Sequence, residues 1–235
     1  MENRLAKILA HAGVASRRAC EELIFDGKVK VNGEICLLPQ TKVNPKKDRI
    51  DVNGKRISNL EKKVCFALNK PKGYLCSSQR PDPSTKLVID LFAHLPYRLY
   101  TVGRLDKASE GLILVTNDGE FAQEVIHPSK RIEKEYLVKV REFIFADHLE
   151  KISKGSRIEG AFVKPKKVAK VRKNSVKITV MEGKKHEVRL LCKRAGLHVM
   201  ELRRIRIGNL RLGNLAKGSY KEISEKEKKA LVNPH

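Results

Sequence analysis

The chain has 235 residues, of which 41% are hydrophobic, and its formal net charge is +23. The hydrophobic content supports a packed core, which excludes a disordered polycation, and the length allows one large domain with a small one beside it. A charge this large indicates a polyanionic partner, with nucleic acid ahead of an acidic membrane surface. Residues 161–235 hold 21 Lys and Arg against 6 Asp and Glu, so we expect a basic face there.

The first residues lack an apolar stretch with a cleavage site, and no apolar run reaches bilayer length. We therefore expect a cytoplasmic protein that does not insert into a membrane. The five cysteines are scattered and form no Cys-x-x-Cys pair, and the histidines show no metal-ligand spacing. This pattern argues against a disulfide framework and a metal site, and it predicts reduced cysteines that mostly lie in the core.

Residues 1–60 are predicted to form a self-contained α+β module that opens with two short helices. Apolar residues recur with helical spacing from Leu5 to Ala12, and Gly13 can end this helix. Ser16 can cap a second helix that starts at Arg17. Asn-Gly pairs at residues 32–33 and 53–54 then lie between strand-like residues, which predicts two tight hairpin turns.

This module resembles the RNA-binding domain named after the fourth ribosomal small-subunit protein. The shared pattern is Arg4-Leu-x-Lys, Ala12-Gly-Val-Ala-Ser-Arg-Arg-Ala, Leu23-Ile and Gly27-Lys-Val-x-Val-Asn-Gly. The resemblance implies that Arg17, Arg18 and Lys28 contact RNA. Both arginines fall in the first turn of the second helix, where the helix dipole disfavours cations, so an external phosphate would relieve the placement. The alternative is a solvated basic turn.

Residues 58–63 are polar and charged, and we expect a linker there, followed by a second domain over residues 61–235. Helix-like and strand-like segments do not alternate regularly in this domain, which predicts an α+β fold with a mostly antiparallel mixed sheet flanked by helices. The predicted strands cover residues 64–68, 99–102, 112–116, 135–140, 163–171, 176–181 and 202–207. The predicted helices cover residues 120–126, 145–154, 186–194 and a short C-terminal stretch from residue 224.

Asp106 lies in a loop between two of these apolar runs, residues 99–102 and 112–116. Both runs are short, rich in β-branched and aliphatic residues, and bounded by glycines, which is typical of buried strands with tight turns. The loop therefore presents one carboxylate on a rigid frame. A lone Asp after a strand more often forms a turn or caps a helix, so its residue type alone does not make it catalytic.

Three segments of the second domain resemble motifs of the RsuA/RluB family of ribosomal RNA pseudouridine synthases, in the same order along the chain. They are Gly103-Arg-Leu-Asp-x-x-Ser-x-Gly-Leu-x-Leu-Val-Thr-Asn-Asp-Gly, Lys134-Glu-Tyr and Glu182-Gly-Lys-Lys-His-Glu-Val-Arg-Leu, with further matches at Asn69-Lys-Pro-Lys-Gly and Arg204-Ile-Arg-Ile-Gly. The resemblance implies the pseudouridine synthase fold and an isomerase without a cofactor or metal. The implied partner is ribosomal RNA or a ribosome assembly intermediate, bound by a monomer.

The resemblance implies catalytic roles for three residues. Asp106 would be the carboxylate beside C1′ of the target uridine, acting either as a nucleophile or in an elimination from the ribose. Tyr136 would pack against the extruded base, and Arg189 would pair with Asp106 and keep it ionised. From residue types alone, Tyr136 could be an ordinary strand tyrosine and Arg189 a helix-surface arginine.

Four further residues would contact the RNA. Arg104 would help the target nucleotide leave its stack or hold a phosphate, and Leu190 would lie against the base, although a core leucine looks the same. Lys185 and His186 stand where the family more often has Asn and Arg. A histidine at the start of a helix is more often a surface group or a phosphate contact than a general base.

In the order of its motifs and in length the chain most resembles the branch of this family that modifies large-subunit (23S) RNA, with the small-subunit (16S) branch close behind, so the resemblance implies a 23S target ahead of a 16S one. From a different class, the chain could be a ribosome-assembly factor that binds RNA without catalysis, but a pure binder would not need Asp106, Tyr136 and Arg189 together. An RNA methyltransferase would show a glycine-rich nucleotide loop after the first strand of a βαβ unit, and none is visible.

Overall fold

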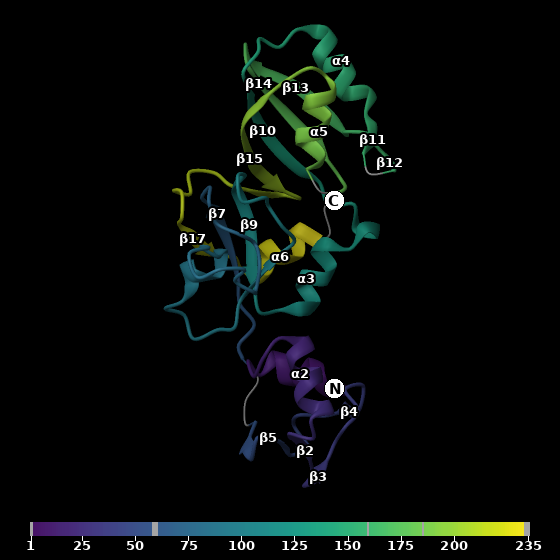
Figure 1. Ribbon diagram of the computed structural model, residues 1–235, viewed down its shortest axis with the longest axis vertical. Helices are drawn as coiled ribbons and strands as arrows, with labels where there is room; N and C mark the ends of the chain where they lie inside the picture. Colours follow the sequence, from purple (N-terminus) through teal and green to yellow (C-terminus); the bar gives the residue numbers. More distant parts are fainter. Residues whose placement is uncertain (1, 58–60, 159, 185, 233–235) are drawn as a thin grey trace. The chain divides into compact units, whose positions relative to one another are not determined.

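The computed structural model describes residues 2–57, 61–158, 160–184 and 186–232 (Figure 1). Lys185 and part of the predicted linker, residues 58–60, lie outside the described residues. The chain folds into two compact units. The first comprises the chain up to Lys63 with the short segments 96–98 and 117–119, and the second comprises the rest.

The first unit opens with the two predicted helices, α1 (Leu5–His11) and α2 (Arg17–Phe25). Ser16 caps α2, since its Oγ accepts the backbone N–H of Ala19 at 3.1 Å. Gly13 follows α1 with a φ of +77°, a left-handed conformation in which glycine commonly ends a helix. The core of this unit is formed by apolar side chains of both helices and of the strands that follow, among them Leu5, Leu9, Ile24, Val29 and Ile50. The predicted helix pair is confirmed.

Short antiparallel strands complete the first unit. They are β1 (Asn3–Arg4) paired with β4 (Lys42–Val43), and a four-stranded sheet in the order β3 (Glu34–Ile35), β2 (Val29–Val31), β5 (Ile50–Val52) and β6 (Lys55–Arg56). Both Asn-Gly pairs of this sheet have positive φ, at 54° and 93° for residues 32–33 and at 49° and 75° for residues 53–54. Two consecutive positive φ values define the type I′ turn that joins hairpin strands, so both predicted hairpins are confirmed.

A nine-stranded sheet organises the second unit (Figure 1). Its main order is β13 (Lys167–Arg172), β14 (Ser175–Val180), β10 (Lys134–Val140), β15 (Val199–Ile207), β9 (Glu110–Thr116), β7 (Cys65–Lys70) and β17 (Tyr220–Glu222), with β16 (Leu210–Arg211) beside β15 and β8 (Tyr100–Val102) beside β9. The β9–β15 pair is parallel and the other pairs are antiparallel. The prediction of a mostly antiparallel mixed sheet is confirmed.

Helices bury both halves of this sheet. The helices α4 (Ala146–Lys154) and α5 (Glu187–Arg194) lie side by side near β13 and β15, and alternate residues of β10 and β14 are buried, including Tyr136, Val138, Val176 and Ile178 (Figure 1). The helices α3 (Gly119–Ile126) and α6 (Glu225–Val232) share a second core with β7 and β9. The 3₁₀ turns Val88–Phe92 and Pro128–Lys130 lie in the connections.

One predicted strand, residues 163–171, is wrong in its extent. The structure divides it into β12 (Ala161–Val163), which pairs with β11 (Ser156–Ile158), and β13, which joins the large sheet. Pro165 lies between β12 and β13, and because proline has no N–H to donate it cannot continue a ladder of strand hydrogen bonds. The β-branched residues on both sides hid this break from the sequence pattern.

The cysteines agree with their predicted core placement. Cys20, Cys65, Cys76 and Cys192 are buried and Cys36 is partly buried, and no disulfide joins them in the part of the chain that the structure describes. Burial raises the pKa of the Cys192 thiol to about 12. No helix among the described residues is long and apolar enough to cross a bilayer.

Candidate active site

The loop that carries Asp106 joins β8 to β9 and is held through its backbone by the segment after β7. The fully buried Lys70 at the end of β7 donates from Nζ to the carbonyl oxygens of Asp106 at 3.1 Å and Ser109 at 2.7 Å, and to Pro71 at 3.2 Å. The N–H of Gly73 also donates to the Lys107 carbonyl at 2.8 Å. Burial lowers the pKa of Lys70. The loop is thus a rigid platform for one carboxylate.

A row of paired residues runs across the sheet and places Tyr136 on the face where this loop lies. Tyr136 on β10 pairs with Arg204 on β15, Arg204 pairs with Gly111 on β9, and Gly111 pairs with Lys70 on β7. Directly paired residues point to the same face, and Lys70 reaches the Asp106 loop on that face. Adjacent strands are about 4.8 Å apart, so Tyr136 lies roughly 10 Å from Gly111 across the sheet.

Gly111 makes the close approach of β9 and β15 possible. Its φ is +105°, and a Cβ at this position would lie 2.3 Å from the carbonyl oxygen of Arg204. No other residue fits that space without moving a backbone. The sequence pattern used Gly111 as a turn signal, whereas the structure shows it inside the sheet, between the loop of Asp106 and the strand of Arg204.

Two side chains, those of His186 and Arg189, converge on the Asp106 carboxylate, which is 34% exposed. His186 Nε2 is 3.3 Å from Oδ1, and this contact is an ion pair when the imidazole is protonated. Arg189 Nε is 4.0 Å from Oδ2, too long for a hydrogen bond but within ion-pair range. Arg189 also donates to Ser109 Oγ at 3.3 Å, so the arginine contacts the loop itself as well as its carboxylate.

The turn before α5 directs His186 toward Asp106, and the first turn of α5 carries Arg189. His186 has a left-handed φ of 54°, uncommon for a residue other than glycine, and it directly precedes the helix. Glu187 is buried and accepts the backbone N–H of Lys184 at 3.1 Å, and burial raises the pKa of its carboxyl group. Lys134 at the start of β10 donates to the carbonyls of Met181 at 3.3 Å and Glu182 at 3.4 Å. The Lys134–Tyr136 strand and the turn of His186 are therefore joined.

Arg204 is a site residue for which the sequence suggested no role. It is buried, its Nε donates to the Leu112 carbonyl at 2.7 Å, and its Nη2 has no hydrogen-bond partner among the described residues. Lys70 was likewise matched only as part of a motif. For Lys70 the signal was a long cationic side chain at the end of a strand of apolar residues, because such a charge is buried only where polar groups receive it. Arg204 stands between Arg203 and Arg206, so the sequence does not single it out.

The structure brings some predicted residues together and leaves others apart. Asp106, Arg189 and His186 meet directly, whereas Tyr136 shares the face of the sheet but no hydrogen bond with Asp106 in the described part of the chain. Arg104 is exposed and Leu190 is half-buried on α5. In the first unit Arg17, Arg18 and Lys28 are exposed; Arg17 pairs with Glu21 at 3.5 Å and Lys28 with Asp26 at 3.0 Å.

Comparison with known proteins shows the family of this chain. Residues 64–194 match the family described as RNA pseudouridylate synthase, and residues 3–50 match the S4 domain. The chain belongs to the RNA pseudouridine synthases. It is therefore an isomerase with an S4-type RNA-binding domain, and the family predicted from its motifs is confirmed.

Relatives of this pseudouridine synthase match it over nearly its whole length. A chloroplast protein of Arabidopsis thaliana described as a putative ribosomal large subunit pseudouridine synthase is 49% identical over 97% of this chain, which spans 60% of that protein. Ribosomal large subunit pseudouridine synthase B of Bacillus subtilis is 39% identical over 97% of this chain and 95% of its own. A crystal structure of a pseudouridylate synthase superposes with a TM-score of 0.70 at 28% identity, covering 97% of this chain and 99% of the other.

Proposed function

We propose that this pseudouridine synthase isomerises one uridine of large-subunit ribosomal RNA and that Asp106 is its catalytic carboxylate. The observation that carries the proposal is the convergence of Arg189 and His186 on a single partly exposed carboxylate, whose loop is fixed by the buried Lys70. The large-subunit target is supported by the names of the two relatives described above.

The reaction breaks the N1–C1′ bond of the uridine and forms a C5–C1′ bond; the proton on C5 leaves and N1 takes up a proton, so the product is an isomer of the uridine. Asp106 acts at the ribose, either by attacking C1′ or by taking a proton in an elimination, and the detached uracil turns before C5 bonds to C1′. Arg189 holds the carboxylate in place through its contacts with both Asp106 and Ser109. The loop supplies a preorganised charge, and preorganised electrostatic stabilisation is usually the largest single contribution to catalysis.

Tyr136 provides a surface for the extruded base. Its ring is almost fully buried on the same face of the sheet as the Asp106 loop, and base extrusion is needed because a stacked uridine cannot reach a carboxylate. Stacking on an aromatic ring contributes about 1–3 kcal/mol per base, comparable with the few kcal/mol that extrusion costs. Leu190 on the neighbouring helix supplies an apolar contact.

RNA is held outside the pocket by basic side chains of both parts of the chain. Residues 1–60 dock structured RNA through Arg17, Arg18 and Lys28, and residues 61–235 carry the reaction, with Arg104, Lys185 and His186 contacting the target strand. The protein acts as a monomer on naked RNA or on an assembly intermediate, in the cytoplasm.

The target is tested by mapping pseudouridines in ribosomal RNA from cells with and without this protein. The proposal predicts the loss of a large-subunit site, restored by the wild-type chain and not by Asp106→Asn. The exposed Asp147→Asn variant on α4 is the matched control and restores the site. A lost small-subunit site would overturn the proposed target, and an unchanged map in cells whose ribosome assembly is impaired would favour a binding factor without catalysis.

A further inference from the structure

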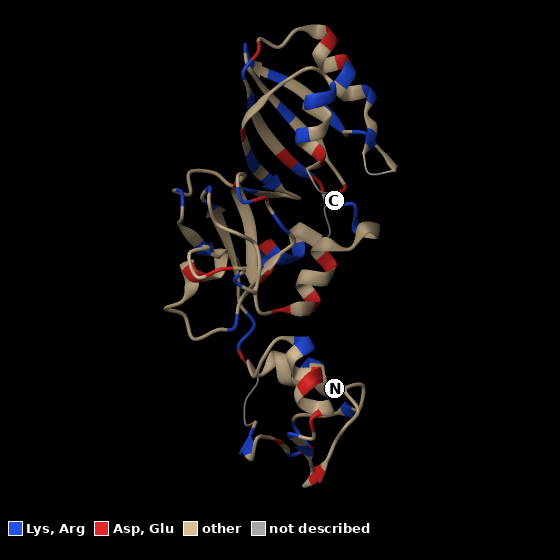
Figure 2. Ribbon diagram, viewed as in Figure 1, with Lys and Arg blue, Asp and Glu red and all other residues tan. Residues whose placement is uncertain are grey.

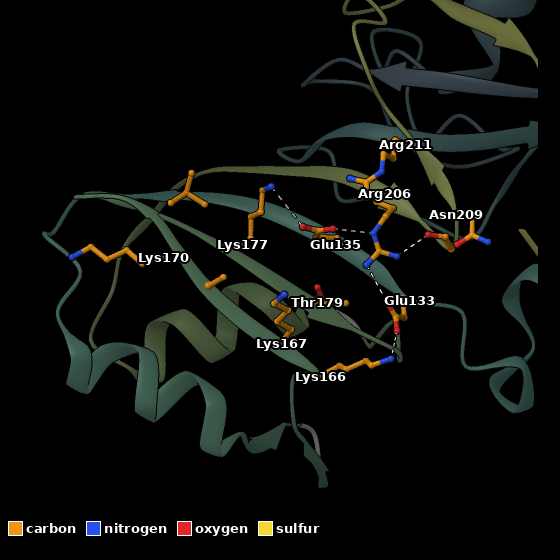
Figure 3. Close-up of a pocket in the computed structure, with 13 residues that line it drawn as sticks. Glu133, Glu135, Lys166, Lys167, Lys170, Lys177, Thr179, Arg206, Asn209 and Arg211 are labelled. Carbon is orange, nitrogen blue, oxygen red and sulfur yellow. Dashed lines mark hydrogen bonds and ion pairs between the residues drawn. The ribbon is translucent and has the colours of Figure 1, made fainter. Parts of the chain in front are cut away.

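A basic surface, separate from the candidate active site, lies on the opposite face of the large sheet. Glu135 precedes Tyr136 on β10, so its side chain points to the opposite face. Thr179 and Lys167 pair in register with Glu135 across β14 and β13, and on the other side Arg206 pairs with it on β15. Their side chains line a groove of about 1000 Å³, shown in Figure 3, which we call the rear groove.

The lining of the rear groove is strongly cationic. It holds six Lys and Arg side chains against two carboxylates, and its charged members are Lys166, Lys167, Lys170, Lys177, Arg206, Arg211, Glu133 and Glu135. The net charge of +4 is concentrated on five adjoining strands and their turns, and Figure 2 shows Lys and Arg along the same part of the sheet. A concave surface of one sign focuses the electrostatic potential that attracts a polyanion.

A bulge in β15 brings Arg206 into this groove. Glu135 pairs with Arg206 while Tyr136 pairs with Arg204, so the register shifts by one residue between them. Two residues that are two apart on one strand would normally share a face, but the bulge sends Arg204 toward the active-site face and Arg206 into the rear groove. The same strand therefore serves both surfaces.

The two carboxylates of the groove are occupied within the protein. Arg206 donates to Glu135 Oε2 at 2.9 Å, to Glu133 Oε2 at 3.0 Å and to the Gly208 carbonyl at 2.7 Å, and Lys166 also pairs with Glu133 (Figure 3). These contacts use Arg206 as an internal brace between β10 and β15. They also hold the pKa of Glu133 below its usual range, so its charge is matched by the protein.

Other cations of the groove have no carboxylate partner in the part of the chain that the structure describes. Lys167 and Arg211 are exposed and lie on β13 and β16, at opposite sides of the braced arginine, and Lys170 donates only to the Ile144 carbonyl. They can bind an external anion without first breaking an internal ion pair. Within the groove, Arg206 therefore pairs with the two carboxylates, whereas Lys167, Lys170 and Arg211 remain available to an external anion.

The chemistry of the lining favours the backbone of structured RNA. Small-molecule pockets are lined mainly by apolar and aromatic groups, whereas the apolar members here are only Ala169 and Val171. The described lining has no aromatic side chain on which a single-stranded base could stack. Lysine and arginine that contact phosphates without reading bases are typical of binding to RNA helices.

We propose that the rear groove binds phosphates of an RNA helix beyond the nucleotide in the active site, through Lys167, Lys170 and Arg211. The choice of RNA as the anion rests on the proposed function, while the groove itself does not depend on the role of Asp106. The contact adds affinity for a large folded substrate and leaves the choice of uridine to the active-site face.

The test is the double variant Lys167→Gln, Arg211→Gln in the full-length protein. Its matched control is Lys226→Gln, Lys229→Gln on α6, which removes the same charge from exposed residues of the same unit outside the groove. Affinity for a labelled large-subunit RNA transcript and for a 20-base-pair RNA duplex is measured as a function of salt. Equal urea midpoints for the two variants establish that both are folded.

The groove variant is expected to bind both RNAs on the order of tenfold more weakly at 0.1 M salt. The slope of log affinity against log salt should become shallower by roughly 0.7–0.9 for each lost phosphate contact. Equal affinities and slopes for groove and control variants would overturn the proposal, as would weaker binding with an unchanged slope. Because the assay measures binding and not catalysis, its result would stand even if Asp106 were not the catalytic carboxylate. The groove variant is expected to show normal turnover at saturating RNA.

Discussion

Lys70→Met is the substitution that tests most sharply how the active-site loop is built. Methionine keeps the length and apolar stem of lysine but removes the ammonium that donates to the carbonyls of Pro71, Asp106 and Ser109. Each buried carbonyl left without a donor costs about 1–3 kcal/mol, and release of a buried charge offsets part of that sum. We expect a net loss of roughly 2–4 kcal/mol and a fall in melting temperature of about 5–15 °C.

The variant should lose activity as well as stability. A shift of about 1 Å in a catalytic group costs on the order of 100-fold in rate, so turnover in a C5-tritium release assay should fall at least that far at a temperature where the variant is folded. Lys72→Met, two residues along the same segment but exposed, is the control and should behave as wild type. Wild-type stability and turnover in Lys70→Met would refute the role of Lys70.

The difference in stability between the wild-type protein and Lys70→Met should change with pH in a defined direction. Burial lowers the pKa of Lys70 in the folded state, so between that value and the ordinary lysine pKa the unfolded chain binds more protons than the folded one. Lys70 therefore makes the stability of the wild-type protein rise with pH through this window, and Lys70→Met lacks this contribution. The stability difference between the two proteins should widen from neutral to alkaline pH in urea unfolding, and a narrowing difference would contradict the assignment.

Three further predictions follow from other contacts. Arg189→Gln should lower turnover in tritium release by about 100-fold with RNA affinity unchanged, while Lys193→Gln, one turn along α5, should be neutral; equal effects would contradict the Asp106–Arg189 pairing. His198 lowers the pKa of Glu142 to about 2, so the stability from this pair is present above the usual Glu pKa of 4.5 and is lost as the pH falls toward 2. The urea midpoints of wild type and Glu142→Gln should accordingly differ at pH 7, draw together below pH 4.5 and converge only as the pH reaches about 2, and a constant difference would refute this. In native protein a thiol reagent should modify the partly buried Cys36 first, and rapid reaction of Cys192, whose pKa is raised to about 12 by burial, would contradict its placement.

Local signals in the sequence predicted most of the fold because they depend on neighbouring residues. Ser16 before a helix, Asn-Gly between strands and the alternation of Val176, Ile178 and Val180 each specify a short segment, and each segment formed as predicted. The strand over residues 163–171 was wrong because Pro165 acts on hydrogen bonds to a neighbouring strand, and strand partners are not visible in a local pattern.

The candidate site was predictable in its motif residues and not in the contacts that position them. Asp106 and Arg189 were expected to meet from a resemblance, and the structure places them 4.0 Å apart. The supporting roles of Lys70 and Arg204 depend on the register of β7, β9 and β15, which includes one parallel pair and residues more than 90 apart in sequence. The bulge that turns Arg204 and Arg206 to opposite faces of the sheet likewise has no signal in the sequence, since both arginines lie in one stretch of mixed apolar and basic residues.

The assignment of Asp106 is tested most directly by single-turnover tritium release from C5-labelled large-subunit RNA. The wild-type protein should release one tritium for each uridine converted, and Asp106→Asn, which keeps the size of the side chain, should release none while binding the RNA with near-normal affinity. Tritium release by Asp106→Asn at the wild-type rate would contradict the role of Asp106 as the catalytic carboxylate.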